Sequence, residues 1–247
     1  ERTAADVLVT ANAVGKRAGK IPVTVGVCNG FVGNRMLYAR ARQVEALLQG
    51  GGSPIRLDTA AQNFGFAMGP CAVGDLSGLD VGYAARKESG RRSPVADAIV
   101  ERGRHGQKNR AGYYLYEEGS RTPVPDPEID ELIAEVAARE GVTRRDLSDE
   151  EITERLVFPL INEGAKILAE GIATRASDID LIYIYGYGFP VAKGGPMFYA
   201  DMIGLNNIVA KLRRYAELSG DDTLQPAPLL VELAESGGTF RTWAGKG

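Results

Sequence analysis

The sequence predicts a mainly α-helical fold built from two copies of one helical domain. The stretch GPCAVGDLSGLD, Gly69 to Asp80, is echoed by GPMFYADMIGLN, Gly195 to Asn206, so that Gly-Pro, four residues, Asp, two residues and Gly-Leu occur twice. A long apolar stripe at helical spacing, ended by glycine, precedes each copy. Two copies are far too few for a solenoid. A duplicated domain whose copies pack about a pseudo-two-fold axis is therefore the simplest prediction.

The elements of the first half follow from apolar spacing, β-branched runs and the positions of proline and glycine. They are a helix over 4–18, a strand over 22–27, a long amphipathic helix over 31–49, a shorter helix over 58–65, a helix opened by Pro70 that runs to about Glu88, and a helix over 96–102.

The second half begins after an aromatic, strand-like patch at 112–116 and a proline-rich linker at 121–127. A helix is expected over 128–139. Ser148 and Glu151 then form a capping box, with Ser148 accepting from the helix amides and Glu151 reaching back, and they open the second long helix. The predicted domains are 1–28, 29–120, 121–147 as linker and packing helix, and 148–247.

Composition excludes several classes of protein. The 247 residues are 44% hydrophobic and 25% charged, with a net charge of -3 that is not concentrated in blocks, which is typical of a globular protein. The basic segment 101–110 carries no aromatic residues that could stack on bases, so nucleic acid is not an expected partner. Cys28 and Cys71 lack metal-ligand spacing, so neither a metal site nor a disulfide is expected, and a reducing compartment is favoured.

No run approaches the roughly 20 apolar residues that span a bilayer, and the first residues do not resemble a signal peptide. A location in the cytoplasm is the expectation. Residues 1–6 also read as the beginning of a helix in mid-protein, which suggests a piece of a longer chain.

Few residues favour chemistry on their own. The stretch 186–191 begins like a dinucleotide fingerprint but has Val191 at the third glycine position and no flanking βαβ unit, so a cofactor site is not expected there. His105 lies among cations with a glycine after it, which favours a solvated loop residue over a general base. Asp75 and Asp201 follow Gly-Pro by the same step, and bonds to backbone amides are favoured over catalysis.

Asn34 is more suggestive, because it lies at the start of the long helix, just past the predicted strand. Its uncharged amide could donate a hydrogen bond to a substrate carbonyl or to water. A local bond at the helix start explains the residue equally well, so the two interpretations stay open.

The motifs of the first half, taken together, resemble the 3-hydroxyacyl-CoA dehydrogenase family at the junction where the nucleotide-binding domain passes into the helical domain. They are GKIPVTV (19–25), NGFVGNR (29–35), FGFAMGP (64–70), DLSGLD (75–80), GQK (106–108) and GYY (112–114). The second half resembles the extra helical domain of multifunctional β-oxidation enzymes. Its motifs are NEGA (162–165), EGIA (170–173), DID (178–180), GYGFP (186–190) and GGPM (194–197).

The resemblance implies a helical fold like the C-terminal domain of 6-phosphogluconate dehydrogenase, with residues 1–28 as a remnant of the nucleotide-binding domain. It implies oxidation of L-3-hydroxyacyl-CoA with NAD, which the absent nucleotide-binding domain would bind together with the catalytic His-Glu dyad. Asn34 is the one catalytic counterpart in this chain. The resemblance places Phe31, Met68, Gly69 and Pro70 against the acyl-CoA.

Two functions are therefore carried forward. In the first, the chain closes the substrate cleft of such a dehydrogenase and is inactive alone. Its partners are then acyl-CoA, its own missing N-terminal domains and a second copy of the chain. In the second, the chain is a non-catalytic scaffold for dimerisation or docking. The effect of replacing Asn34 separates the two, because a scaffold should ignore that substitution.

Overall fold

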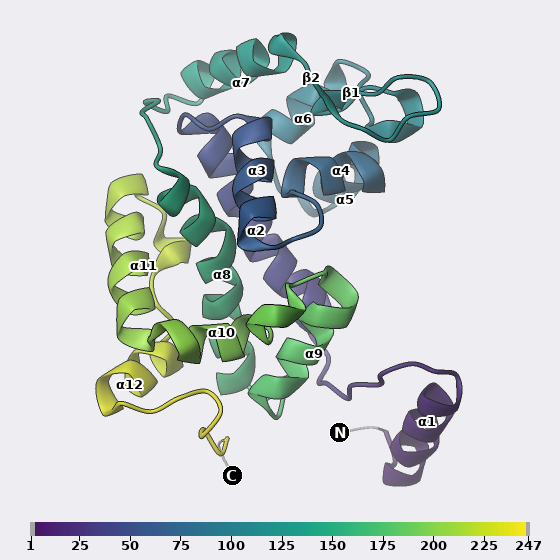
Figure 1. The fold of residues 1–247 in the computed structure, drawn as a ribbon, viewed down its shortest axis with the longest axis vertical. Coiled ribbons are helices and arrows are strands. Elements are labelled where there is room, and N and C mark those ends of the chain that lie inside the picture. The colour runs from purple at the N-terminus through teal and green to yellow at the C-terminus, as the bar shows by residue number, and fades with distance from the viewer. Residues whose placement is uncertain (1–2, 246–247) are drawn as a thin grey trace. The chain divides into compact units, whose positions relative to one another are not determined.

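The computed structural model describes residues 3–245, which divide into two compact units (Figure 1). One unit, the Asn34 unit, holds the residues up to Ala39 together with those from Phe158 onward, and the other, the central unit, is Arg40–Val157. Both boundaries fall inside long helices, α2 (Phe31–Gln49) and α8 (Asp149–Ala169). The predicted helical class is confirmed, since residues 3–245 form twelve α-helices and a single two-stranded sheet.

The central unit is a chain of packed helices with a small sheet. Its elements are α3 (Pro54–Phe64), α4 (Pro70–Ser77), α5 (Leu79–Ser89), α6 (Pro94–Glu101), β1 (Tyr114–Leu115), β2 (Val124–Pro125) and α7 (Pro127–Arg139). Successive helices from α3 to α7 pack on one another, around a core that includes Leu57, Ile99 and Ile133. The strand expected near 112–116 is present, and it pairs antiparallel with Val124–Pro125, inside the stretch expected to be only a linker.

The Asn34 unit contains α1 (Ala5–Arg17), the first part of α2, the second part of α8, and four further helices drawn in green and yellow in Figure 1. These are α9 (Ala176–Tyr187), α10 (Pro196–Ile203), α11 (Leu205–Ser219) and α12 (Pro228–Ser236). Helix α10 packs on α9 and α11, and α11 packs on α12. Tyr183, Phe189 and Phe240 are fully buried in this unit.

The repeated motif is a pair of short helices joined at a left-handed glycine. Pro70 and Pro196 are the first residues of α4 and α10, where a missing backbone N–H costs nothing. Gly78 has φ 89° and ψ 112°, and Gly204 has φ 88° and ψ 122°, a conformation that favours glycine. The single helix predicted from Pro70 to about Glu88 is therefore wrong, because the chain turns at Gly78 and begins α5.

A carboxylate from the preceding helix caps each of these short helices. Asp58 of α3 accepts from the backbone N–H groups of Cys71 and Ala72, at 2.8 and 2.9 Å. Asp180 of α9 accepts from the N–H of Met197 at 2.8 Å and, at longer range, from that of the next residue. The first turn of a helix carries unpaired N–H groups and partial positive charge, which a carboxylate satisfies. The two aspartates occupy equivalent places in the two copies.

The glycine of each Gly-Pro pair makes room for this carboxylate. A Cβ at Gly69 would overlap Asp58, and a Cβ at Gly195 would overlap Asp180. The Gly-Pro pair thus meets two needs of this turn: glycine leaves space for the capping carboxylate, and proline starts the helix.

Asp75 and Asp201 make the backbone bonds that the sequence predicts. Asp75 accepts from the N–H groups of Tyr113 and Tyr114 at 2.9 and 3.1 Å. Asp201 accepts from Phe240 and Arg241 at 2.8 and 3.0 Å. Each aspartate therefore fastens the later part of its own copy to the motif helix.

Three further local predictions need correction. Residues 22–27 form no strand, since the structure gives them no sheet neighbour, although the Gly26 N–H donates to the Ile172 carbonyl at 2.7 Å. The helix expected from Asp58 begins earlier, at Pro54, because a proline is accommodated in the first turn. Ser148 accepts from the Glu151 N–H at 3.1 Å as predicted, but the Glu151 carboxylate pairs with Arg145 and Arg155 rather than reaching back.

Among the helices of residues 3–245, none has both the length and the apolar character needed to cross a membrane. Burial raises the pKa of the fully buried Cys71 thiol well above its ordinary value, so this sulfur is kept as an inert thiol.

Candidate functional site

Asn34 lies on the first turn of α2 with its side chain exposed. Its backbone N–H donates to the Gly30 carbonyl at 3.1 Å, which is an ordinary helix bond. The side chain makes no local bond at the helix start. Its Oδ1 instead accepts from the hydroxyl of Tyr187, the last residue of α9, at 2.7 Å. The local alternative considered for Asn34 is therefore not what the structure shows.

Tyr187 is held in place by its neighbours in the same unit. Its ring stacks on that of Tyr183, with centroids 4.9 Å apart and planes 19° apart. The Tyr183 hydroxyl donates to the Gly33 carbonyl at 3.1 Å. A Cβ at Gly33 would overlap the Tyr187 ring, so glycine at this position lets the ring lie against the helix. Burial raises the pKa of Tyr187, which keeps its hydroxyl protonated at neutral pH.

Arg35, next to Asn34, joins the first turn of α2 to the end of α8. Its guanidinium contacts Glu163 at 2.7 Å and Glu170 at 2.5 Å. The hydrogen bonds to Glu170 raise the pKa of Arg35, so the pair stays charged. A bidentate guanidinium-carboxylate contact fixes geometry as well as charge. The turn that carries Asn34 is thus anchored from both sides.

Phe31 begins α2 in a left-handed conformation, with φ 49°, which is unfavourable for a bulky side chain. Its side chain is 56% exposed. The carbonyl of Phe31 accepts from the Cys28 thiol at 3.2 Å, and its N–H donates to the Cys28 carbonyl at 3.0 Å. A strained backbone that presents an exposed aromatic ring is a feature found at binding sites.

The other residues expected at the substrate lie in the central unit, at the start of α4. Met68 is half-buried and precedes Gly69, which lies against Asp58, and Pro70, which starts the helix. Of the predicted site residues, the structure thus brings Phe31 and Asn34 together in one unit and Met68, Gly69 and Pro70 together in the other.

Sequence reasoning missed Tyr187 and Arg35 as parts of this site. Both lie in motifs that the sequence displays, GYGFP and NGFVGNR. The bond between Asn34 and Tyr187 spans 153 positions, and no local pattern reports a contact at that separation. The glycine at 33, which has no helix-ending role, is the one signal that something packs closely there.

The family model for the C-terminal domain of 3-hydroxyacyl-CoA dehydrogenase matches residues 30–116 and 152–246. The chain belongs to this family. Each matched stretch contains one copy of the Gly-Pro motif, so the predicted duplication of the helical domain is confirmed.

Named relatives agree with this assignment. The peroxisomal bifunctional enzyme of Danio rerio is 43% identical over 96% of this chain, which covers 36% of that protein. The Homo sapiens protein of the same name is 39% identical over 93% of the chain and 35% of the relative. The chain thus spans about a third of the length of the curated relatives it matches.

A solved structure gives the same result. The dehydrogenase part of multifunctional enzyme 1 from C. elegans superposes with a TM-score of 0.73 and 30% identity, covering 92% of this chain and 53% of that one. The predicted helical fold is therefore shared with a solved structure of this family.

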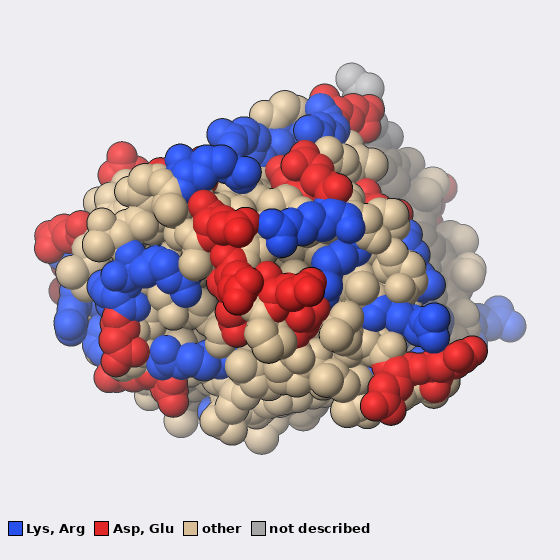
Figure 2. Space-filling model, turned by 90° about the horizontal axis from the view of Figure 1, so that it is seen from above, with Lys and Arg blue, Asp and Glu red and all other residues tan. Residues whose placement is uncertain are grey.

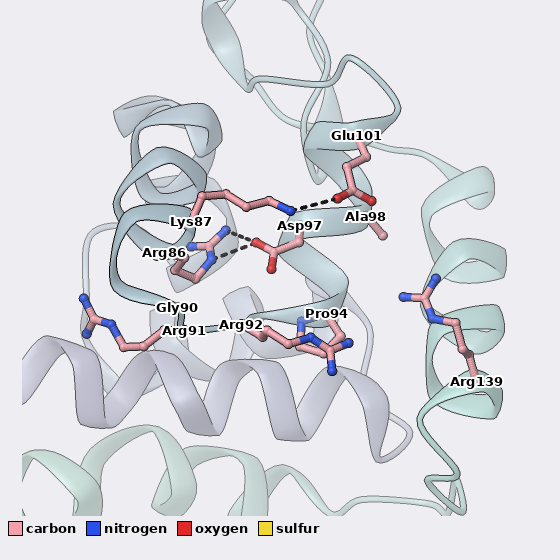
Figure 3. A pocket seen from close by; sticks show the side chains of 10 residues that line it. All are labelled: Arg86, Lys87, Gly90, Arg91, Arg92, Pro94, Asp97, Ala98, Glu101 and Arg139. Atoms are coloured by element: carbon pink, nitrogen blue, oxygen red, sulfur yellow. Dashed lines mark hydrogen bonds and ion pairs between the residues drawn. The ribbon is translucent and has the colours of Figure 1, made fainter.

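A hollow of about 300 Å³ in the central unit of this dehydrogenase-family chain lies between α5 and α6 (Figure 3). Its lining is rich in basic side chains, but acidic groups pair with them: Asp97 with Arg86 at 2.6 Å and Glu101 with Lys87 at 3.8 Å. The two carboxylates neutralise basic side chains that would otherwise attract a bound anion. None of the predicted site residues lines the hollow, and it is not assigned as a site.

Charge on the face seen in Figure 2 is mixed, with acidic and basic side chains interspersed rather than gathered by sign. Among residues 3–245, no group of three or more His, Cys, Asp or Glu side chains is arranged to hold a metal ion. The structure thus leaves the surroundings of Asn34 as the candidate site in this family member.

Proposed function

We propose that this chain is the C-terminal part of an NAD-dependent L-3-hydroxyacyl-CoA dehydrogenase that acts in fatty-acid β-oxidation. In this proposal the chain closes the acyl-CoA cleft, supplies Asn34 and mediates assembly. The observation that carries the proposal is the Asn34 carboxamide, which is exposed at a helix start and fixed through its oxygen in a chain that matches the family over both halves.

The geometry suits a hydrogen-bond donor at the reacting oxygen. Oδ1 of the exposed Asn34 accepts from Tyr187, and within residues 3–245 its Nδ2 group has no hydrogen-bond partner, so Nδ2 can donate to a ligand. Such a donor can hold the substrate oxygen, or orient the catalytic histidine of the nucleotide-binding domain, without changing charge itself. When bound by that domain, NAD supplies the hydride acceptor for the oxidation. We assign no NAD contact to this chain.

The N-terminal segment supports the proposed missing domain. Helix α1 has no buried residue, and Val7, Val9 and Val14 are all more than half exposed. Val27, in the stretch expected to be a strand, is 85% exposed. Apolar groups gathered on a surface mark an interaction site. The proposal gives residues 1–28 to the end of the nucleotide-binding domain, whose remaining part would cover these exposed groups.

The remaining parts of the proposal follow from the sequence and the relatives. Residues 29–120 and 148–247 are proposed as the two C-terminal domains, with 121–147 as the linker and packing helix between them. A second copy of the chain remains a proposed partner. The relatives' names place them in peroxisomes, and we propose that compartment for this chain if its source is eukaryotic.

Complementation tests the proposal. The purified chain, mixed with 3-hydroxybutyryl-CoA and NAD, is expected to form no NADH above the buffer control. Adding the nucleotide-binding domain of a relative as a separate polypeptide should restore NADH formation, and the Asn34→Ala chain should restore a rate about 10²- to 10³-fold lower than the unchanged chain does. Turnover by the chain alone at a rate near that of a complete enzyme would refute the proposal. Restoration that ignores Asn34→Ala would favour the docking scaffold instead.

Phe31 offers a test of substrate contact. In the reconstituted enzyme, Phe31→Gly is expected to raise the KM for 3-hydroxybutyryl-CoA by about three- to tenfold, because an exposed aromatic contact surface is lost. Phe31→Ala should raise KM equally but be less stable than the glycine variant by about 1 kcal/mol, because alanine keeps the left-handed strain. Steady-state kinetics and thermal unfolding measure the two effects. An unchanged KM would remove Phe31 from the substrate site.

A further inference from the structure

Asn34 alone cannot determine which end of its carboxamide, oxygen or nitrogen, faces a ligand. The side chain is exposed, and the oxygen and nitrogen ends of a carboxamide are nearly the same in shape, so an isolated asparagine would present either end to a ligand. Catalysis by a hydrogen-bond donor needs the nitrogen end, held in one orientation before the substrate arrives. Some other group must therefore select it.

The Tyr187 hydroxyl meets this requirement. It lies 2.7 Å from Oδ1 of Asn34 and donates to it, which directs the Nδ2 protons away from the tyrosine. Within residues 3–245, the structure gives Nδ2 no hydrogen-bond partner. The carboxamide thus has one satisfied end and one end available for a ligand.

The tyrosine is itself prevented from moving. Its ring stacks on Tyr183, and the Tyr183 hydroxyl is bonded to the carbonyl of Gly33, the residue that directly precedes Asn34. The space for the Tyr187 ring exists because Gly33 has no Cβ. Two tyrosines on successive turns of α9 therefore bond to neighbouring residues on the first turn of α2, Tyr183 to Gly33 and Tyr187 to Asn34.

We propose that Tyr187 is a positioning residue, which the second copy of the helical domain provides for Asn34 in the first. This inference rests on the proposed function of Asn34 and deepens it. The Tyr187 hydroxyl fixes the carboxamide so that its Nδ2 group points to the substrate, and it takes no part in the reaction itself. The second copy then contributes to the reaction through this contact.

A double-mutant cycle in the reconstituted enzyme tests the inference. Tyr187→Phe removes only the hydroxyl and is expected to lower kcat for 3-hydroxybutyryl-CoA oxidation about tenfold, with KM changed less than about twofold. Asn34→Ala should cost more. The double variant should be no slower than Asn34→Ala alone, because Tyr187 acts only through Asn34.

Tyr185→Phe is the matched control, since Tyr185 lies two residues earlier on α9 with its side chain 67% exposed. It should leave kcat unchanged. In the chain alone, the NMR signals of the Asn34 side-chain amide should shift in Tyr187→Phe and stay in place in Tyr185→Phe. This second measurement reports the contact without using activity.

The outcomes separate the two proposals. If Asn34→Ala is slow while Tyr187→Phe matches the wild type, the role of Tyr187 is refuted and that of Asn34 stands. If the two losses multiply in the double variant, Tyr187 acts elsewhere and the inference is wrong. If Asn34→Ala itself is fully active, the proposed role of Asn34 fails, and the positioning role fails with it.

Discussion

Asn34→Ala is expected to lower kcat of the reconstituted dehydrogenase by about 10²- to 10³-fold, with little change in KM for 3-hydroxybutyryl-CoA. Removing one preorganised donor at a reacting oxygen has an effect of this size, because the hydrogen bond strengthens as charge develops in the transition state. Steady-state NADH formation measures it. The fold should be unaffected, since the side chain is exposed and its hydrogen bond to Tyr187 is the one it makes within residues 3–245.

Asn34→Asp is the sharper control. The carboxylate has the same shape but no donor, and its charge repels negative charge that develops on the substrate oxygen. It should be at least as slow as alanine, while thermal unfolding of all three proteins coincides. A variant that retains kcat within about twofold, with a normal melting curve, would contradict a donor role for this residue.

Asp75→Ala is expected to reduce the stability of the central unit by about 3–5 kcal/mol. The side chain is 1% exposed, and its carboxylate accepts from three donors, including the Tyr116 hydroxyl at 3.0 Å. Alanine leaves all three donors without a partner in the interior, where each loss is costly. Urea unfolding followed by circular dichroism, with hydrogen exchange of peptides from 40–157, measures the change.

Asp201→Ala provides a control from the other copy of the domain. Asp201 stands at the same place in the motif and also accepts two backbone N–H groups, but it is only half-buried. Water can replace its bonds, so the expected cost is about 1 kcal/mol. Equal losses for the two variants would show that burial does not set the effect.

The dependence on pH follows from the same residue. Burial raises the pKa of Asp75 to about 6, despite the opposing hydrogen bonds from Tyr113 and Tyr114. An unfolded aspartate has a pKa of about 4. Between these values the folded carboxyl holds a proton that the unfolded one has released, so this group makes the unfolding free energy fall as pH rises.

Asp75→Asn cannot titrate and should lose that part of the slope. The comparison is made between wild type and variant at each pH, because Asp180, whose pKa burial raises to about 7, titrates in both. Parallel stability curves for the two proteins would contradict the raised pKa of Asp75.

Much of the architecture was readable because it depends on local patterns. Apolar spacing gave the long helices α2 and α8, and the repeated Gly-Pro spelling gave the duplication. The break at Gly78 was missed, because glycine inside an apolar helical pattern reads as a tolerated defect until its left-handed backbone is seen. The strand at 22–27 was wrong, because β-branched composition cannot say whether a neighbouring strand exists.

The site was only half readable. Asn34 was suggested by its place at a helix start and by the family resemblance, but its surroundings depend on a residue far along the chain. The compact unit that holds Asn34 consists mostly of the second copy, although the residue belongs to the first by sequence. Contacts of this kind arise from packing, which spacing alone does not encode.

The aspartate caps affect how the helices of this protein open locally. A helix ordinarily frays from its ends, and its first-turn amides exchange with solvent before the rest. Here the first turns of α4 and α10 are fastened to carboxylates carried by α3 and α9. These amides cannot open while the partner helix stays folded around its aspartate. In each copy the two helices should therefore open as one cooperative element, with shared rates of hydrogen exchange.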